Sequence, residues 1–173
     1  NVWSTASAGK ADIIRSYDAV AIDRHNENFV EIVRSQTNGR GVDHILDPIG
    51  GEHLKRSLSV LAQGGKLYTY GMSSAAPSSK RSLWKALKAL RSRPRFDPML
   101  MMSRNQGVFG VHMGTWNDEN VMQEQMQNIL KGINEGALTP IIDSIYDAKD
   151  VASAHQHIHD GKNIGKVLLK FNE

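Results

Sequence analysis

Residues 42–54, VDHILDPIGGEHL, decide the fold. The apolar run at residues 42–47 predicts a buried β-strand, and Gly50 and Gly51 end it abruptly. A helix-like stretch begins at Glu52. Because glycine-rich strand exits often bind phosphate, this exit could face a phosphate, another part of a ligand, or no ligand.

Composition limits the class of protein. The 173 residues suggest one domain, and 40% apolar residues are enough for a sizeable core. Mean hydropathy is −0.40, and neither a membrane-length apolar run nor a signal-peptide pattern is found, so we expect a soluble protein. The absence of cysteine excludes disulfides and thiolate zinc sites within this chain, and it suits the cytoplasmic location that we expect. The chain begins at Asn1 rather than Met, which is compatible with a fragment, with a processed chain or with the ordered part of a longer one.

Positive charge gathers in one part of the chain. The net charge is only +3, but no acidic residue lies between Glu52 and Asp97, a window that holds 10 of the 21 Lys and Arg residues. Within it, residues 78–95 form a basic amphipathic stretch. This stretch could bind an acidic membrane surface or a partner, or it could be a helix that covers a cleft with its cations in water.

Strand-like and helix-like segments alternate along the chain. We predict strands at residues 2–6, 19–22, 42–47, 66–70, 107–112, 141–146 and 166–171, and helices at residues 9–16, 28–36, 52–61, 117–135 and 149–160. A turn at residues 63–65 precedes the fourth strand. The alternation predicts an α/β fold, a doubly wound parallel sheet covered on both faces, with ligands at the carboxyl ends of its strands.

The residues at the predicted strand ends have some features of a nucleotide-binding site and lack others. No G-x-G-x-x-G occurs, and the only G-x-G, at residues 39–41, precedes a strand instead of following one. The first exit, residues 4–10, has hydroxyls and Lys10 but no acid to bind a ribose. Lys10, with Arg24 at the next exit, therefore suits an adenosine ribose that carries a 2′-phosphate. Both are also compatible with surface residues in water.

Five stretches together resemble one superfamily. They are STASAGK (4–10), VDHILDPIGG (42–51), GGKLYTYGM (64–72), VFGVHMG (108–114) and HDGKNIGKVLL (159–169). In this order they resemble the medium-chain dehydrogenase/reductase superfamily, in its zinc-independent quinone oxidoreductase branch. SSKRSLW (78–84) and IIDSIY (141–146) add a likeness to the synaptic vesicle membrane protein VAT-1 group. The likeness runs over essentially the whole chain.

The resemblance implies a domain organisation. Residues 1–140 would be a Rossmann cofactor-binding domain from its second strand onward, without the first strand and the glycine-rich turn. Residues 141–173 would return to a GroES-like catalytic domain, to which the last strand would belong. Without the first strand, the middle of the sheet would have unpaired edges.

The resemblance also implies cofactor contacts. Ser7, Lys10 and Arg24 match 2′-phosphate contacts, although relatives often carry Tyr at the position of Arg24. Pro48 matches a position near the ribose where relatives often have Ser or Asn. The remaining matches are Gly71, Met72 and Ser73 beside ribose and pyrophosphate, Phe109, Gly110 and Val111 beside the carboxamide, and Asn163 from the C-terminal segment. No catalytic residue is assigned.

The implied activity is hydride transfer from NADPH to quinones or α,β-unsaturated carbonyls, without zinc, in a homodimer formed through the strand at residues 107–112. A competing hypothesis is a non-catalytic module that binds a membrane surface or a protein partner through residues 80–95. Nucleic-acid binding is not expected, because aromatic residues are only 6% and no reader motif occurs.

Two further features admit more than one interpretation. His155 and His159 would share a helix face, as metal ligands do, but we favour packing for His155 and solvent for His157 and His159. Asp47 is interpreted as a residue that fixes its loop by accepting backbone N–H bonds, not as a catalytic carboxylate. Gly50 and Gly51 would let the backbone approach a ligand closely.

Overall fold

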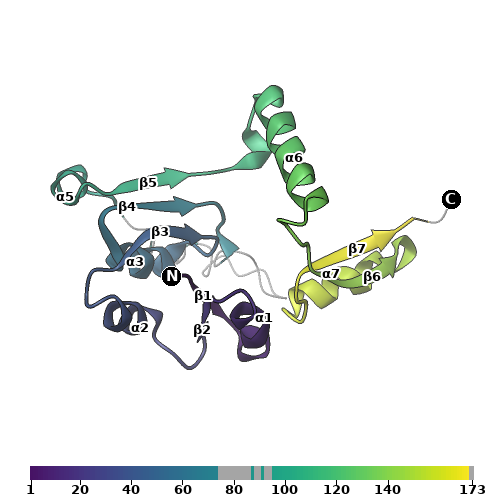
Figure 1. Cartoon of the computed structure of the whole chain (residues 1–173), viewed down its shortest axis with the longest axis horizontal. Helices are drawn as coiled ribbons and strands as arrows, with labels where there is room; N and C mark the ends of the chain where they lie inside the picture. The colour runs from purple at the N-terminus through teal and green to yellow at the C-terminus, as the bar shows by residue number, and fades with distance from the viewer. Residues whose placement is uncertain (74–86, 88–90, 92–94, 172–173) are drawn as a thin grey trace. The chain divides into compact units, whose positions relative to one another are not determined.

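The computed structural model describes residues 1–73, 87, 91 and 95–171. These form two compact units, residues 1–115 and residues 116–173 (Figure 1). Most of the basic stretch at residues 78–95 lies outside the described residues. The domain boundary expected at residue 140 concerns the organisation of a longer protein and stays a prediction.

The first unit confirms the predicted alternation of strands and helices. Its elements are β1 (Trp3–Ala6), η1 (Ala8–Lys10), α1 (Ala11–Arg15), β2 (Val20–Asp23), α2 (Phe29–Gln36), β3 (Val42–Asp47), α3 (Gly51–Ser59), β4 (Leu61–Thr69), α5 (Pro98–Arg104), β5 (Gly107–Gly110) and η3 (Met113–Thr115). Helix α5 was not predicted. Asp97 caps it by accepting from the Met99 N–H, and Pro98 occupies its first turn.

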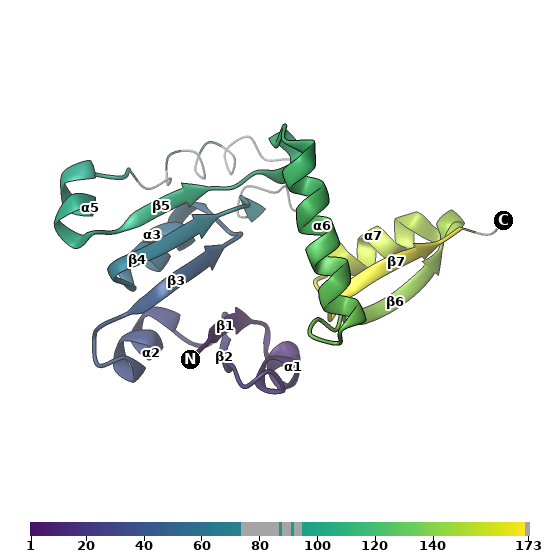
Figure 2. The same ribbon diagram turned by 45° about the horizontal axis from the view of Figure 1, so that its top comes forward.

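All strand pairs of the first unit are parallel, as predicted. β1 pairs with β2, and β3, β4 and β5 run side by side in the same direction (Figure 2). Among the described residues no strand ladder joins β1 to β3, so the strands form two sheets. The break falls where the resemblance places the absent first Rossmann strand.

Two apolar clusters hold these sheets to their helices. Ile22, Val33 and Val60 form one, and Leu54, Leu61 and Leu67 form the other. Ile45 on β3 packs against both clusters. Burying a side chain of this size contributes roughly 1.5–3 kcal/mol, so the clusters stabilise the face of β3 that carries Ile45.

The prediction of a strand buried on both faces is wrong for β3 among the described residues. Side chains alternate along a strand, and Leu46, next to Ile45, is 70% exposed. Leu46 pairs in register with Tyr68, whose ring stacks on Phe109 at 5.3 Å between centroids. One face of the β3–β4–β5 sheet therefore carries apolar side chains that the described residues leave partly open.

The glycine turn predicted before β4 lies inside it. β4 begins at Leu61, and its register with β3 shifts between Val42 and His44. Gly64 has φ +77, a left-handed conformation that other residues rarely adopt. The irregularity thus absorbs residues 63–65 without ending the strand.

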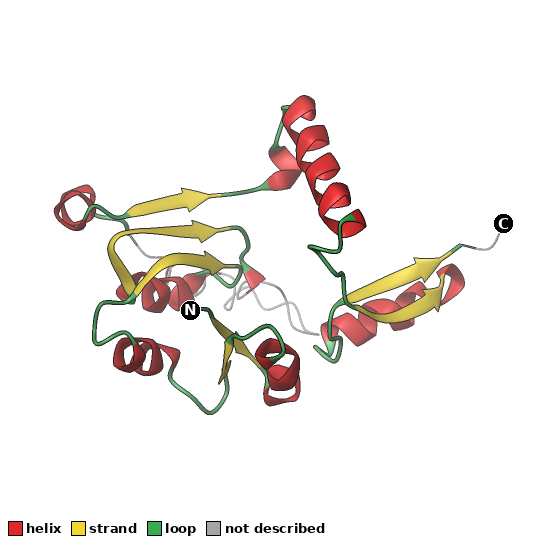
Figure 3. Ribbon diagram, in the orientation of Figure 1, coloured by secondary structure: helices red, strands yellow, loops and turns green. Residues whose placement is uncertain are grey.

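The second unit contains α6 (Glu119–Asn134), β6 (Ile142–Asp147), η4 (Ala148–Asp150), α7 (Val151–His159) and β7 (Lys166–Lys170). β6 and β7 are parallel, and α7 packs on the pair (Figure 3). Asp118 caps α6 by accepting from the Val121 N–H. None of the helices in the described residues is long and apolar enough to cross a membrane.

Candidate functional site

Backbone hydrogen bonds connect the loop that follows β3 to the loop that follows β4. The Tyr70 N–H donates to the Asp47 carbonyl at 3.2 Å, and the Ser73 N–H donates to the Pro48 carbonyl at 3.1 Å. A Cβ on Gly71 would lie 2.6 Å from the Pro48 oxygen. Gly71 is therefore required for this close approach, and the structure brings Pro48, Gly71 and Ser73 together.

Gly50 is favoured for a different reason, its backbone conformation. Its φ is +74, and a Cβ there would lie 3.4 Å from the Gly71 oxygen and 3.5 Å from Met72. These distances are ordinary van der Waals contacts, so the positive φ, and not a close approach to the neighbouring loop, favours glycine at this position. The expected approach of Gly50 to a ligand stays a prediction. Asp47, by contrast, fixes its loop as predicted, because it accepts from the N–H groups of Ile49 and Gly50 at 2.8 and 2.9 Å.

The β5 residues lie beside the β4 end. Phe109 and Gly110 pair with Tyr68 and Thr69, and the Val111 N–H donates to the Thr69 carbonyl at 2.9 Å. Because parallel strands end at one edge, these residues share the carboxyl edge of the sheet with the loops after β3 and β4.

The ends of β1 and β2 are also joined. The Arg24 N–H donates to the Ala6 carbonyl at 2.9 Å, and the Lys10 N–H donates to the Ser7 carbonyl at 2.9 Å. Arg24 is thus tied to the residue that precedes Ser7. Asn163 lies in the second unit, where its side chain donates to the Gly165 carbonyl, and its predicted cofactor contact stays a prediction.

A cavity of about 180 Å³ opens at these strand ends. It is lined by Thr5, Arg24, Glu27, Phe29, Ile49, His53 and Arg56. Of the predicted contacts, only Arg24 lines it. The cavity combines an apolar wall with two arginines, while Glu27, whose carboxylate accepts from the Asp23 N–H at 2.6 Å, adds one negative charge.

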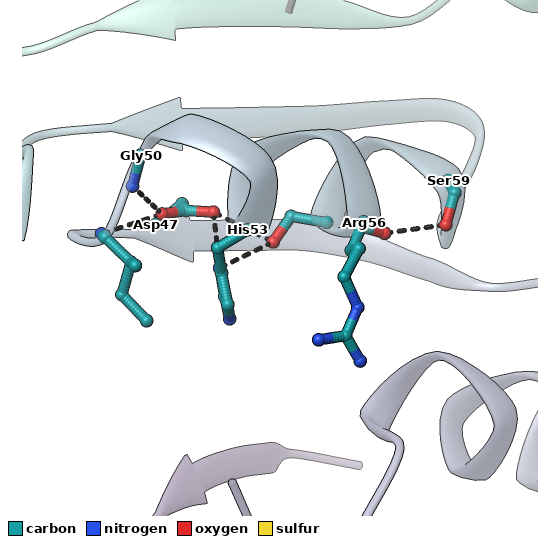
Figure 4. A network of polar contacts seen from close by, with 7 residues as sticks. Asp47, Gly50, His53, Arg56 and Ser59 are labelled. Carbon is teal, nitrogen blue, oxygen red and sulfur yellow. Dashed lines mark hydrogen bonds and ion pairs between the residues drawn. The ribbon is translucent and has the colours of Figure 1, made fainter. Parts of the chain in front are cut away.

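His53, which lines this cavity, is held by the buried carboxylate of Asp47. Figure 4 shows the polar contacts of this carboxylate. Asp47 is fully buried, and besides the two N–H groups it contacts His53 Nδ1 at 3.0 Å and accepts from the Ser57 hydroxyl at 2.8 Å. Burial alone would raise the pKa of Asp47. The hydrogen bonds from His53, Gly50, Ile49 and Ser57 outweigh burial and lower it to about 2, so the group is ionised at neutral pH.

His53 and Arg56 project from the same side of α3, as residues three apart on a helix do (Figure 4). The His53 ring stacks on Phe29 at 5.1 Å between centroids, and the Arg56 guanidinium lies 4.6 Å from the centre of the same ring. Arg56 also donates to the Asn28 side chain at 2.8 Å. The cation and the imidazole are therefore held in place before any ligand binds.

Sequence reasoning missed His53 and Arg56. The available signal was the spacing, since His53 follows Asp47 by six residues and Ser57 follows His53 by one helical turn. An acid at the end of a strand, with a histidine and a serine on one face of the next helix, predicts such a network.

A second cavity of about 450 Å³ is larger but lies elsewhere. Arg34, Arg40, Ser59 and Arg104 are among its lining residues, and these come from helix ends or precede strands. It therefore belongs to the amino ends of the strands. Ligands of open parallel sheets bind at the carboxyl ends, so we assign the candidate site to the smaller cavity.

Of the three histidines of α7, only His159 lies as predicted. His155 and His159 are exposed, whereas His157 is half-buried and its Nε2 contacts Asp143 at 2.8 Å. No group of three possible metal ligands occurs among the described residues. Because these residues offer no site that fits zinc, we derive no step through a metal, and the zinc-independence of the protein stays a prediction.

Comparison with known proteins identifies the family. The sequence profile of a family described as zinc-binding dehydrogenase matches residues 17–169. The synaptic vesicle membrane protein VAT-1 homolog of Rattus norvegicus is 30% identical over 170 residues, which cover 97% of this chain and 42% of that protein. The chain thus spans less than half the length of this relative, and the predicted resemblance to the VAT-1 group is confirmed.

Solved structures show the same fold. An NAD-dependent alcohol dehydrogenase has a TM-score of 0.73 at 20% identity, with 99% of this chain and 44% of that chain covered. A mycobacterial quinone oxidoreductase has a TM-score of 0.71 at 24% identity, with 96% and 48% covered. Together with the family profile, which spans most of the sequence, these findings show that the chain belongs to the zinc-binding dehydrogenase family and has its Rossmann-type α/β fold.

Proposed function

We propose that the chain is the cofactor-binding portion of an NADPH-dependent oxidoreductase that reduces quinones or α,β-unsaturated carbonyls by hydride transfer. One observation carries the choice of cofactor: the cavity at the carboxyl ends of the strands is lined by Arg24 and Arg56, and the adjoining exit of β1 has no acid. A site selective for NADH places an acid there, to bind the ribose hydroxyls.

The residues of the cavity fit the adenosine end of NADPH. Phe29 and Ile49 provide apolar contact for a base, and the two guanidinium groups can bind a phosphate through paired N–H bonds. Ser7 and Lys10, on the turn hydrogen-bonded beside Arg24, would complete the phosphate contacts. Glu27 opposes an anion, but its engagement with the Asp23 N–H directs one carboxylate oxygen into the turn.

The remaining contacts would hold the rest of the cofactor. In this proposal the joined loops of Pro48, Gly71, Met72 and Ser73 lie beside the ribose and pyrophosphate, and residues 109–111 lie beside the carboxamide. Asn163 would join them from the second unit. The nicotinamide supplies the hydride, and the chain supplies position and electrostatics.

Substrate and assembly are part of the proposal. The likeness of fold to a quinone oxidoreductase supports the substrate class, and the family supports an oxidoreductase. β5 pairs with β4 on one side and with no second strand in the described part of the chain, which suits a homodimer through residues 107–112. Sedimentation of the intact protein as a monomer would contradict that dimer.

The alternative function, membrane or partner binding through residues 80–95, rests on a stretch that is mostly outside the described residues. No observation in the structure favours it over the cofactor site. The cytoplasmic location likewise stays a prediction.

Titration with both cofactors tests the proposal. We expect the intact protein that contains this chain to bind NADPH at least about tenfold more tightly than NADH, because charge-assisted hydrogen bonds contribute roughly 1.5–3 kcal/mol each. Arg24→Ala and Arg56→Ala should weaken NADPH binding and leave NADH binding nearly unchanged. Arg34→Ala, which removes an arginine from the larger cavity, is the matched control and should change neither. Equal affinity for both cofactors would contradict the assignment of this cavity to the 2′-phosphate of NADPH.

A further inference from the structure

The larger cavity, of about 450 Å³, is lined by three arginines, and none of the described residues that line it is acidic. Arg34 belongs to the last turn of α2, Arg104 to the last turn of α5, and Arg40 to the turn that leads into β3. The lining takes nothing from β1 or β2. It comes from the segments that lead into β3, β4 and β5, which form one continuous sheet.

Hydrogen bonds between elements fix the walls of this cavity. Arg34 donates to the Ser59 carbonyl at 3.1 Å and so links α2 to the end of α3. The Gln106 side chain donates to the carbonyls of Leu61 and Ala62 at 2.8 and 3.2 Å, which links the residue before β5 to β4. Because these walls are held in place before a ligand arrives, binding would order few further groups.

The G-x-G at residues 39–41 shapes the turn that carries Arg40. Gly41 is buried with φ +85, and a Cβ there would clash with the Val60 carbonyl oxygen. Its N–H donates to the Thr37 hydroxyl oxygen at 2.9 Å. This glycine motif therefore fixes one wall of the larger cavity.

Part of the positive charge in the cavity is already balanced. Arg40 donates from two nitrogens to the Asp43 carboxylate, which neutralises it. The ends of α2, α3 and α5 lie at this cavity, and the C-terminal end of a helix carries roughly half a negative charge. The two full charges of Arg34 and Arg104 exceed that sum, so a positive charge is left to attract an anion.

The donors in this cavity favour phosphate groups. The hydroxyls of Ser59 and Ser103 donate to carbonyls of their own helices, so the guanidinium groups are the donors that a ligand would meet. One guanidinium saturates the two oxygens of a carboxylate, whereas a diphosphate can accept from two guanidinium groups at once. A volume of about 450 Å³ is in the range of sites for small organic molecules.

We propose that the larger cavity is a second binding site, which takes a small molecule with a diphosphate or two phosphate groups through the guanidinium groups of Arg34 and Arg104. None of the predicted cofactor contacts lines it, so this inference does not rest on the proposed function. Open parallel sheets bind their cofactor and substrate at the carboxyl ends of the strands. The ligand of this site is therefore a third molecule, bound at the opposite ends.

The test titrates the intact protein that contains this chain with inorganic pyrophosphate at low ionic strength, since salt screens exposed charges. Arg34→Ala and Arg104→Ala should each weaken binding about tenfold, as expected for the loss of a charge-assisted contact. Arg15→Ala removes an arginine from the last turn of α1, outside the cavity, and is the matched control that should leave the affinity unchanged. Equal weakening by Arg15→Ala would mean unspecific attraction and overturn the site. Loss of binding in Arg24→Ala but not in Arg34→Ala would place the anion in the smaller cavity, which also overturns it.

A second measurement uses only the wild-type protein and does not depend on how well a variant folds. Pyrophosphate should raise the protection from hydrogen exchange at residues 37–41 and 103–107 and leave residues 5–10 unchanged. No added protection at the first two segments would overturn the proposal. A hexaglutamate peptide that binds more tightly than pyrophosphate would replace the small phosphate ligand with an acidic protein segment. Vesicles of phosphatidylcholine and phosphatidylserine that bind through the same two arginines, when pyrophosphate does not, would likewise overturn the soluble ligand.

Discussion

The two units of the molecule each contain an aspartate–histidine–serine cluster. The two clusters differ in how deeply the aspartate is buried and in how far apart in the sequence the residues that it connects lie. In the first, fully buried Asp47 binds two N–H groups within three residues, together with His53 and Ser57 of the next helix. In the second, Asp143, whose side chain is 16% exposed, accepts from the Ile164 N–H at 2.6 Å and contacts His157 and Ser144.

The same three residue types therefore have two different structural roles in the two units. The Asp47 cluster fixes a local turn and the start of α3, so that the loop beside the cavity has one shape. The Asp143 cluster connects β6 to a loop 21 residues later and to α7, so it closes the second unit. Because unpaired polar groups are costly in proportion to their burial, the first cluster should be the less tolerant of change.

The largest expected effect is the loss of the Asp47 carboxylate. Asp47→Asn leaves a buried amide among donors that require an acceptor, and we expect it to lower the free energy of unfolding by roughly 3 kcal/mol. Asp143→Asn should cost less, since water can reach its partners. Hydrogen exchange resolved by segment should show lower protection in β3 and α3 for the first variant, and in β6 and β7 for the second.

Controls for these variants lie on the same strands. Asp43→Asn on β3 and Asp147→Asn on β6 remove exposed carboxylates and should leave exchange nearly unchanged. If Asp143→Asn proves as costly as Asp47→Asn, burial does not distinguish the clusters.

The next largest effect is the loss of stability in acid as the Asp47 carboxylate is protonated. The pKa of Asp47 in the folded chain, about 2, is below its ordinary value of 3.8, so its stabilisation is complete above about pH 4 and is lost as the pH falls towards 2. The pKa of Asp143 is also lowered, mainly by the Ile164 N–H and then by Ser144 and His157. Urea unfolding at pH 6, 4, 3 and 2 should show a steeper decline between pH 4 and 2 in the wild type than in Asp47→Asn. Parallel declines would mean that Asp47 is not the group that titrates.

The smallest expected change in the free energy of unfolding comes from removing the serine hydroxyls of the two clusters. Ser57 is buried and donates to Asp47, so Ser57→Ala should cost about 1 kcal/mol. Ser144 donates to the neighbouring residue, Asp143, and the loss of this local bond should fall within the error of an unfolding measurement. A thermal unfolding series of both variants would rank them, and a larger loss for Ser144→Ala would reverse the comparison.

The fold was predictable because the local patterns agree with it. Residues 42–47 became β3 with the predicted bounds, and Asn28 and Asp118 cap helices where polar residues precede apolar periodicity. The turn before β4 was misplaced, since a glycine pair with a left-handed residue is compatible with an irregular strand as well as with a strand boundary. The exposure of Leu46 could not be predicted, because an apolar run does not show which of its faces the described residues cover.

Only those parts of the candidate site that follow from the positions of the strand ends could be predicted from the sequence. The parallel topology accounts for where Pro48, Gly71 and Arg24 lie, because each follows the carboxyl end of a strand. Their cofactor contacts stay predictions. His53 and Arg56 were missed because their role depends on the direction in which α3 leaves the loop. That direction is set by Asp47 and by the left-handed Gly50, which are features of tertiary packing.

The pairing of each strand with the next one along the chain has a consequence for biosynthesis. Every ladder in the described residues joins consecutive strands, β1 with β2, β3 with β4, β4 with β5, and β6 with β7. Contacts between nearby segments form quickly, so a nascent chain can complete each pair as soon as the second strand leaves the ribosome. The slowest step in the first unit should be the arrival of β5, because residues 70–106 must be synthesised between β4 and its partner. Until then the edge of β4 would expose unpaired N–H and C=O groups that can pair with another chain.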